Sequence, residues 1–202
     1  MVPLTTRPPD IVFREKAVGK LTADIGVYVL YDLDDVAVYV GQTVSVSERG
    51  IRGRVQRHLT SARSDPISNR QIDVWEIAFV RAWPESDHNK INELEASLYY
   101  DLNPKSTLMN GKIPTKPTNT AIIPAPAQME QVLPDEVIKD RLNPSLRLPR
   151  QVEHYGQMVS HYLTVKDSAE IARSMVAHFE RLQRYHAALL AVAGPAPTGT
   201  DE

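Results

Sequence analysis

The stretch that decides the fold is GVYVLYDLDDVAVYVG, residues 26–41. Its two ends, 26–31 and 36–41, are rich in β-branched and aromatic residues, which favour strands. Between these runs lies a polar turn, Asp-Leu-Asp-Asp, at 32–35. Two apolar runs joined by a short polar turn predict a β-hairpin.

A helix is predicted to follow the hairpin, between residues 48 and 61. Apolar residues recur there at every fourth position, which is the spacing of one helix face. Two glycines weaken the first turn, so the helix is expected to start near Arg52. The recurring apolar residues are Ile51, Val55 and Leu59.

A third strand is predicted at 72–81, where β-branched and aromatic residues return. A second helix is predicted at 90–102, with Asp87 or Asn89 as its N-terminal cap. An Asn-Pro pair at 103–104 ends it, because proline disfavours helix in the residue before it. Together these elements predict an α+β fold: a small, mostly antiparallel sheet of three strands, flanked by helices.

Composition divides the chain into five parts. Residues 1–22 are predicted to form an N-terminal arm, and residues 23–111 the main domain. Residues 112–149 contain seven prolines, which exclude a continuous helix or a central strand. An extended connector that wraps the main domain is therefore predicted there. Residues 150–193 have a helical pattern, and residues 194–202 have the composition of a disordered tail.

The helical extension at 150–193 carries an apolar stripe. Asp167 or Ser168 is predicted to cap the helix that bears it. Apolar residues at helical spacing more often pack in a core or an interface than bind a ligand, so a second layer or a homodimer contact is predicted. The stripe consists of Ile171, Met175, Phe179, Leu182 and Leu189.

Composition also excludes several classes of protein. The chain has no cysteine, so it has no disulfide framework, and any metal must bind to oxygen or imidazole ligands. Its 202 residues are 42% hydrophobic and 24% charged, as in globular proteins. No apolar run approaches the roughly 18 residues that span a bilayer, and the N-terminus does not resemble a secretory signal. A cytoplasmic protein with no membrane contact is predicted.

Basic side chains are concentrated between residues 48 and 70, although the net charge is −2. Six arginines stand there against two acidic residues, so a basic stripe lies on a nearly neutral body. Such a stripe attracts the phosphates of a nucleic acid. DNA is the predicted partner, and the arginines expected to contact it are Arg49, Arg52, Arg57, Arg63 and Arg70.

Side chains suited to phosphoryl transfer occur along the main domain. Two tyrosines lie on adjacent hairpin strands, and an Arg-x-x-x-His pair points one way from the following helix. A carboxylate, an arginine, a tyrosine and a histidine can together hold a metal, neutralise developing charge and accept a proton from water. The candidate residues are Tyr28, Tyr39, Arg54, His58, Glu93, Glu95 and Asn110.

The order and spacing of these residues resemble the GIY-YIG nuclease family. The resemblance covers about residues 24–111, and its specificity comes from five ordered elements together. They are Gly-Val-Tyr at 26–28, Tyr-Val-Gly at 39–41, Arg-Val-Gln-Arg-His at 54–58, Leu-Glu-Ala-Ser-Leu at 94–98, and Pro104 with Asn110.

The resemblance implies roles for the residues of the hairpin and the helix after it. Tyr28 matches the tyrosine that acts as the general base or orients the attacking water. Tyr39 matches a second tyrosine, which contacts the phosphate or assists proton transfer. Gly41 keeps the backbone close beneath the site. His58 resembles a histidine that some members, restriction enzymes among them, place one turn after the arginine.

The resemblance also implies residues that bind phosphate and metal. Arg54 matches the arginine that binds the scissile phosphate, and Glu95 matches the single carboxylate that holds Mg²⁺ or Mn²⁺. Asn110 matches the asparagine that closes the motif set and steadies the site. Three positions keep a rival: Arg49 for Arg54, Glu93 for Glu95 and Asn103 for Asn110.

The function that the resemblance implies is a metal-dependent endonuclease that hydrolyses phosphodiester bonds in DNA, with a restriction-type role as one reading. Two alternatives stay open: a non-catalytic DNA-binding or interaction module on the same scaffold, and a structure-selective repair nuclease. The modest total charge slightly favours the non-catalytic module. The intact set of tyrosines, arginine, glutamate and asparagine favours catalysis.

Overall fold

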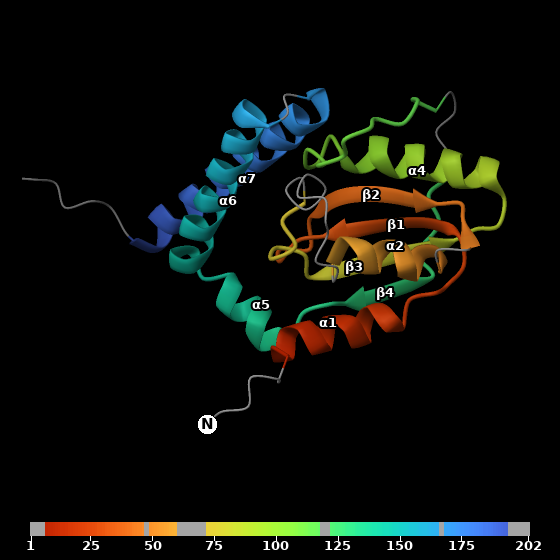
Figure 1. Ribbon diagram of the computed structural model, residues 1–202, viewed down its shortest axis with the longest axis horizontal. Coiled ribbons are helices and arrows are strands. Elements are labelled where there is room, and N and C mark those ends of the chain that lie inside the picture. The colour runs from red at the N-terminus through yellow and green to blue at the C-terminus, as the bar shows by residue number, and fades with distance from the viewer. Residues whose placement is uncertain (1–6, 47–48, 60–71, 118–121, 166–167, 194–202) are drawn as a thin grey trace, which may run out of the picture.

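The computed structural model describes residues 7–46, 49–59, 72–117, 122–165 and 168–193. The fold is α+β, as predicted, with helices on both faces of one sheet and a helical hairpin beside it (Figure 1). Within the described ranges, no helix is both long enough and apolar enough to span a bilayer.

The sheet has four antiparallel strands where three were predicted. β1 (Gly26–Tyr31) and β2 (Ala37–Thr43) form the predicted hairpin, and β1 also pairs with β3 (Phe79–Pro84). The additional strand, β4 (Gln128–Gln131), pairs with β3 and comes from the proline-rich segment. The order β2-β1-β3-β4 places β2 at one edge of the sheet.

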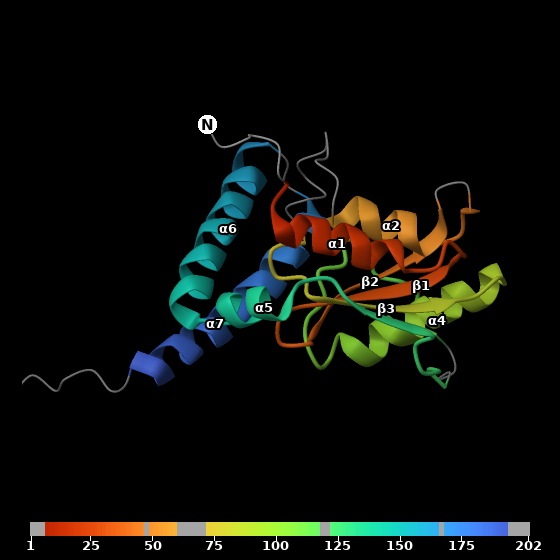
Figure 2. The ribbon, with the colours of Figure 1, turned by 90° about the horizontal axis from the view of Figure 1, so that it is seen from below.

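The sheet lies between two helical layers. α1 (Pro9–Gly19) and α2 (Gly50–Leu59) cover one face, and α4 (His88–Leu102) covers the other (Figure 2). Successive residues of a strand point to opposite faces. In β1, Tyr28 and Leu30 therefore belong to the core on the α1–α2 side, while the residues between and beside them belong to the core on the α4 side.

Within the predicted N-terminal arm, residues 9–19 are instead a helix packed on the sheet. Ala17 and Val18, near the end of α1, and Leu21, just after it, are each 3% exposed or less. Only the last turn of α1 reaches the core. The segment therefore lacks the repeating apolar pattern that reveals a helix in a sequence.

α4 ends at residue 102 as predicted but begins two residues before the predicted 90, and α2 likewise begins two residues before the predicted Arg52. Asp87 caps α4, because its Oδ1 accepts a hydrogen bond from the backbone nitrogen of Asn89 at 2.8 Å. The helix ends just before Asn103. α2 begins at Gly50 and not near Arg52, since glycine readily adopts the left-handed conformation (φ +53°) found at this helix start.

Residues 112–149 are not an extended connector throughout. They contain β4, then α5 (Asp135–Arg141) and the first turns of α6 (Pro144–Thr164). Regular structure forms here because β4 contains no proline and because Pro144 stands in the first turn of α6, where a missing N–H costs no helical hydrogen bond. Pro149, by contrast, lies inside α6, where the prolines were expected to exclude a continuous helix.

The earlier part of this segment wraps the main domain, as expected. The Tyr100 hydroxyl donates a hydrogen bond to the carbonyl oxygen of Pro114 at 3.1 Å. The Trp83 indole N–H donates to the carbonyl oxygen of Pro124 at 2.8 Å. These two bonds fasten the segment to α4 and to β3.

α6 and α7 (Ala169–Ala193) form a helical hairpin whose buried face is mostly polar. The predicted apolar stripe is not the core face of the hairpin, because of its five members only Ile171 is fully buried and Phe179 is 50% exposed. Ser168 does cap α7, with its Oγ accepting from the Ile171 nitrogen at 3.2 Å. The buried residues are Arg147, Gln151, His154, Met158 and His161 of α6, and Ile171, Ser174, Ala177, His178, Arg181 and Tyr185 of α7.

The polar face of the hairpin meets a buried carboxylate of the main domain. Glu76 accepts two hydrogen bonds from Arg147 (3.1 and 2.7 Å), one from Gln151 (3.0 Å) and one from Tyr185 (3.3 Å). Glu76 lies in residues 72–78, which form turns, so β3 starts at residue 79 instead of the predicted 72. The strand propensity of this segment is overridden by these tertiary contacts.

Candidate active site

Tyr28, Tyr39 and His58 form an aromatic cluster on the α2 side of the sheet. Tyr28 pairs with Gly41 in the β1–β2 ladder, so Tyr39, two residues earlier on β2, is its diagonal neighbour on the same face. The ring centroids lie 6.2 Å (Tyr28–Tyr39), 5.9 Å (Tyr28–His58) and 5.2 Å (Tyr39–His58) apart. The Oη of Tyr28 is hydrogen-bonded to Nε2 of His58 at 2.8 Å.

Gly41 leaves room for this cluster. A Cβ at position 41 would lie 2.5 Å from the Cζ and Oη atoms of Tyr28 and 2.7 Å from Cε1 of Tyr39. Any side chain at this position would displace the rings. Gly41 therefore keeps the backbone of β2 close beneath the two tyrosines, where the sequence analysis expected it.

The Tyr28 phenol is protonated at neutral pH. Burial raises its pKa well above the usual 10.0, and the neighbouring Tyr39 adds to the rise. The charge of Arg54 and a hydrogen bond from it pull the pKa of Tyr28 down, but by less. A protonated phenol can donate as well as accept, and it donates to His58 in the tautomer whose Nε2 carries no proton.

Tyr28 lies behind Tyr39 and not in contact with solvent. The Tyr28 side chain is completely buried, whereas Tyr39 is half-buried and lines a groove with Arg54. Arg54 stands one helical turn before His58 on α2, as predicted from their spacing. Tyr39 therefore lies at the groove, and Tyr28 lies behind it inside the protein.

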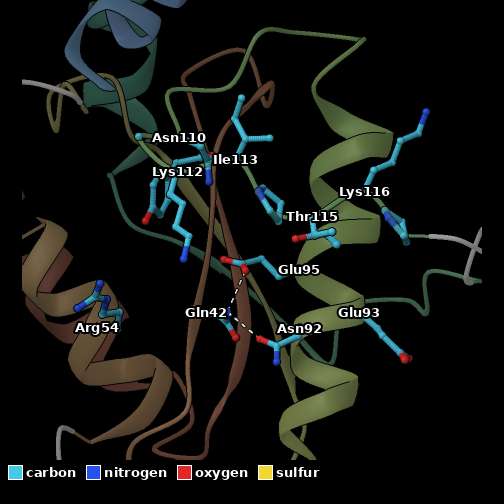
Figure 3. A pocket seen from close by; sticks show the side chains of 15 residues that line it. Gln42, Arg54, Asn92, Glu93, Glu95, Asn110, Lys112, Ile113, Thr115 and Lys116 are labelled. Carbon is cyan, nitrogen blue, oxygen red and sulfur yellow. Dashed lines mark hydrogen bonds between the residues drawn. The ribbon is translucent and has the colours of Figure 1, made fainter. Parts of the chain in front are cut away.

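Glu95 approaches the groove from α4, on the other side of the sheet. Gln42 Nε2 donates hydrogen bonds to Oε2 of Glu95 at 2.9 Å and to Oδ1 of Asn92 at 3.0 Å. Burial raises the pKa of Glu95, while the charge of Lys112 and the bond from Gln42 lower it. The rival Glu93 lines the same groove, but it is exposed and its carboxylate points away from Gln42 (Figure 3).

The two halves of the site meet at the outer edge of β2. Tyr39 and Arg54 reach this edge from the α2 side and Glu95 reaches it from the α4 side, and all three line one groove of about 650 Å³. Figure 3 shows Arg54 on one side of the strands and Glu95 on the other, with the Lys112 side chain directed between them. They can meet here because β2 is an edge strand, with no further strand beyond it to separate the two faces.

Asn110 fixes the strand that carries Tyr39. Its Oδ1 accepts a hydrogen bond from the backbone nitrogen of Val40 at 3.1 Å, and its Nδ2 donates to the Val40 carbonyl oxygen at 2.7 Å. The rival Asn103 instead accepts from the backbone nitrogen of Leu108 at 3.0 Å and so stabilises the loop after α4. Of the two, Asn110 is the one that lines the groove.

The arginines expected to contact DNA differ in their surroundings. Arg49 is exposed at the start of α2, and Arg57 is half-buried on the same helix. Arg52 is engaged within the fold, because its Nε donates to the carbonyl oxygen of Leu21 at 2.7 Å. Arg63 and Arg70 lie outside the described residues.

Gln42 and Lys112 are site residues that the sequence analysis did not single out. Gln42 follows Gly41 directly, and strand alternation alone turns its side chain away from the tyrosine face, toward α4. That signal was available in the sequence. Nothing in the sequence marks Lys112 as a site residue, because it lies in an irregular segment whose path depends on tertiary contacts.

The donors around Glu95 fit a hard divalent cation. In the part of the chain that the structure describes, no three carboxylates or imidazoles gather into a metal cage. One carboxylate with water and substrate oxygens would then hold the ion, which is an arrangement that suits Mg²⁺. Because burial raises the pKa of Glu95, a bound cation would stabilise the ionised form of that carboxyl.

The chain was compared with family models, with curated proteins and with solved structures, and none of them matches it. Its function is therefore inferred from the residues and geometry of the groove.

Proposed function

We propose that this protein is a metal-dependent endonuclease of the GIY-YIG type that hydrolyses phosphodiester bonds in DNA. One observation carries the proposal: Tyr39, Arg54 and Glu95, from three separate elements, line a single groove with the Tyr28–His58 pair directly behind it. These groups supply a proton acceptor, a cation for the developing charge and a metal ligand, as displacement at phosphorus by water requires.

A proton path leads inward from the groove. The attacking water gives its proton to Tyr39, Tyr39 passes its own proton to Tyr28, and Tyr28 passes its proton to Nε2 of His58. The oxygen of the water forms a bond to phosphorus while the bond to the leaving oxygen breaks. His58 ends as imidazolium. The leaving oxygen takes a proton from solvent water, and the hydroxide so formed removes the proton from His58, so the protons balance and His58 is restored. This route needs no standing phenolate, which the raised pKa of Tyr28 disfavours.

Arg54 would bind the phosphate, and Glu95 would hold the metal ion. The planar guanidinium of Arg54 can bind two phosphate oxygens and stabilise the charge that grows on them. Glu95, oriented by Gln42, would hold Mg²⁺ or Mn²⁺, and the ion would neutralise charge on the phosphate. Asn110 keeps Tyr39 in place through Val40.

A non-catalytic module that binds DNA is the main alternative. The Tyr28–His58 bond favours catalysis, because a phenol hydrogen-bonded to an imidazole can pass a proton, whereas the buried phenol does not itself reach a phosphate in the groove. Restriction-type and repair-type enzymes would share this site and differ in the DNA that they select. A cytoplasmic location and a homodimer stay predictions.

Cleavage of a supercoiled plasmid tests the proposal. With Mg²⁺ or Mn²⁺ we expect conversion to nicked or linear DNA, and we expect EDTA to stop the reaction. Discrete fragments from a large linear DNA would indicate a sequence-specific enzyme, whereas preferential cutting of branched DNA would indicate a repair nuclease. Retention of DNA without cleavage under any metal would favour the non-catalytic module.

A further inference from the structure

Residues 106–111 form an irregular strip along the outer edge of β2. The backbone nitrogen of Met109 donates to the carbonyl oxygen of Val38 at 2.8 Å. The side chain of Asn110 bonds both backbone groups of Val40. The two β2 residues that the strip holds, Val38 and Val40, stand on either side of Tyr39. The backbone of Tyr39 is therefore fixed from both sides by this strip.

The opposite side of the strip is held by α7. Arg181 Nη1 donates to the carbonyl oxygen of Thr107 at 2.8 Å. The Ser174 hydroxyl shares its one proton between the carbonyl oxygens of Met109 at 3.4 Å and Glu170, in its own helix, at 3.3 Å. Arg173 donates to the carbonyl oxygen of Gly111. Every second carbonyl of the strip thus accepts a hydrogen bond from one helix of the C-terminal hairpin.

Arg181 also supports the start of β2 in the β1–β2 hairpin. Its Nη2 donates to the carbonyl oxygen of Ala37 at 2.9 Å and to the hydroxyl of Ser106 at 3.0 Å. Ala37 is the first residue of β2. One arginine of α7 therefore joins the start of β2 to the start of the strip.

The strip continues directly into the wall of the groove. Gly111 and Lys112 both line it, and Lys112 lies close enough to Glu95 to lower the pKa of that carboxyl. The strip has no helix or strand of its own, so its position depends on the bonds from β2, α7 and Asn103 and on the buried side chains of Leu108 and Met109. A shift of the strip would move Tyr39 and Lys112 relative to Glu95.

We infer that α7 is a positioning element of the active site, acting through Arg173, Ser174 and Arg181 on residues 106–111. The inference rests on the proposed endonuclease function, and it gives the helical extension a role in the catalytic step itself. None of the three α7 residues lines the groove, so each acts through the strip and not on the substrate.

Arg173 is the residue to vary, because it is only partly buried, whereas Arg181 is 3% exposed and its loss would endanger the fold. Arg173→Met keeps much of the stem but removes every donor. Arg173→Lys keeps a charged group with three N–H donors, one of which suffices for a single carbonyl oxygen. Arg184→Met is the matched control. Arg184 is exposed on the same helix, and its substitution by methionine removes the same charge.

Two readouts are needed on the full-length chain. Amide hydrogen exchange reports the strip without any need for activity: we expect Arg173→Met to speed exchange at the Val40 and Met109 nitrogens, but not at the Val132 nitrogen, which bonds to Ala78 at the far side of the sheet. Single-turnover cleavage should slow at least about tenfold, with the DNA concentration for half-maximal rate unchanged, because misplaced groups lose rate and not binding. Arg173→Lys should recover most of the rate, and Arg184→Met should match the wild type.

Several results would overturn the inference. Equal acceleration of exchange at Val40 and Val132 would mean a general loss of stability. Faster exchange at Val40 with an unchanged cleavage rate would mean that the strip does not position the site. A wild-type protein that cuts no DNA would refute the proposed function, and with it the catalytic part of this inference. Exchange at Val40 and Met109 would still decide whether Arg173 holds the strip.

Discussion

The hydrogen bond between Tyr28 and His58 joins a fully buried phenol on β1 to a half-buried imidazole on α2. Burial keeps the phenol protonated, so Tyr28 is better suited to pass a proton than to take one permanently. Tyr39 is the member of the pair that lines the groove. At the scale of single residues, the order Tyr39, Tyr28, His58 is therefore the proposed path of the proton from the groove to its final acceptor, His58.

Removal of either hydroxyl should break this path. Tyr28→Phe keeps the buried ring, so we expect an unchanged thermal midpoint but a single-turnover cleavage rate lower by about 100-fold or more, as for loss of a general base. Tyr39→Phe should lose rate to a similar degree. If Tyr39→Phe cuts normally while Tyr28→Phe does not, water reaches Tyr28 directly and the path is shorter than proposed.

The pH profile of the same reaction gives a second check. A standing Tyr28 phenolate would make the rate climb steadily toward high pH, because burial raises the pKa of Tyr28 above its usual 10.0. A relay needs no such ionisation. We expect the wild-type rate to be level between about pH 8 and pH 10, the range just below an ordinary tyrosine pKa. A tenfold rise per pH unit over that range would contradict the relay.

At the scale of elements, α2 decides which arginine can reach the phosphate. Arg54 and His58 are four residues apart on this helix, and Arg54 lines the groove beside Tyr39. Arg49 precedes the helix with a left-handed backbone (φ +63°) and an exposed side chain. This placement favours Arg54 over its rival as the phosphate-binding residue.

Alanine variants of the two arginines should separate their roles. We expect Arg54→Ala to lose about 100- to 1000-fold in single-turnover rate with little change in thermal midpoint, as when a transition-state donor is removed. Arg49→Ala should lose only a few-fold, through weaker general attraction to DNA. Arg54→Lys should recover little, because lysine keeps the charge but not the planar fork. An inactive Arg49→Ala beside an active Arg54→Ala would reverse the assignment.

The sequence predicted those elements whose patterns are local. The hairpin, α2 and α4 each carry their own apolar repeat or cap, and the i+4 spacing placed Arg54 with His58 correctly. α1, β4 and the buried face of α7 were not predicted, because each is fixed by contacts with residues distant in the chain. Glu95 was chosen by resemblance, since no periodicity shows that a side chain of α4 and a side chain of α2 line one groove at the edge of β2.

At the scale of the whole molecule, the C-terminal hairpin is joined to the main domain by buried charges. Arg147 of α6 pairs with Glu76 at 2.7 Å, both side chains being nearly inaccessible, and also with the half-exposed Asp34 at 2.7 Å. The apolar residue Phe179 instead remains half-exposed on the outer side of α7. The hairpin is thus attached through polar contacts, and a homodimer contact on its outer side stays a prediction.

The two partners of Arg147 provide a matched test of this attachment. Glu76→Gln leaves a buried arginine without its buried carboxylate, which typically costs about 3–5 kcal/mol in the free energy of unfolding. Asp34→Asn removes a pair of equal length that solvent screens, so we expect a loss of about 1 kcal/mol or less. Urea unfolding of both variants measures the difference. Equal losses would mean that burial does not set the strength of this attachment.

The central claim is that one carboxylate, Glu95, supports hydrolysis of DNA in the groove at the edge of β2. Single-turnover cleavage with Mg²⁺, compared between Glu95→Gln and Glu93→Gln, tests it most directly. We predict a loss of at least about 100-fold for Glu95→Gln with DNA binding retained, as expected when stabilisation of transition-state charge is lost. Glu93→Gln should cut at nearly the wild-type rate, because its side chain is exposed and points away from Gln42. Normal cleavage by Glu95→Gln would contradict the account.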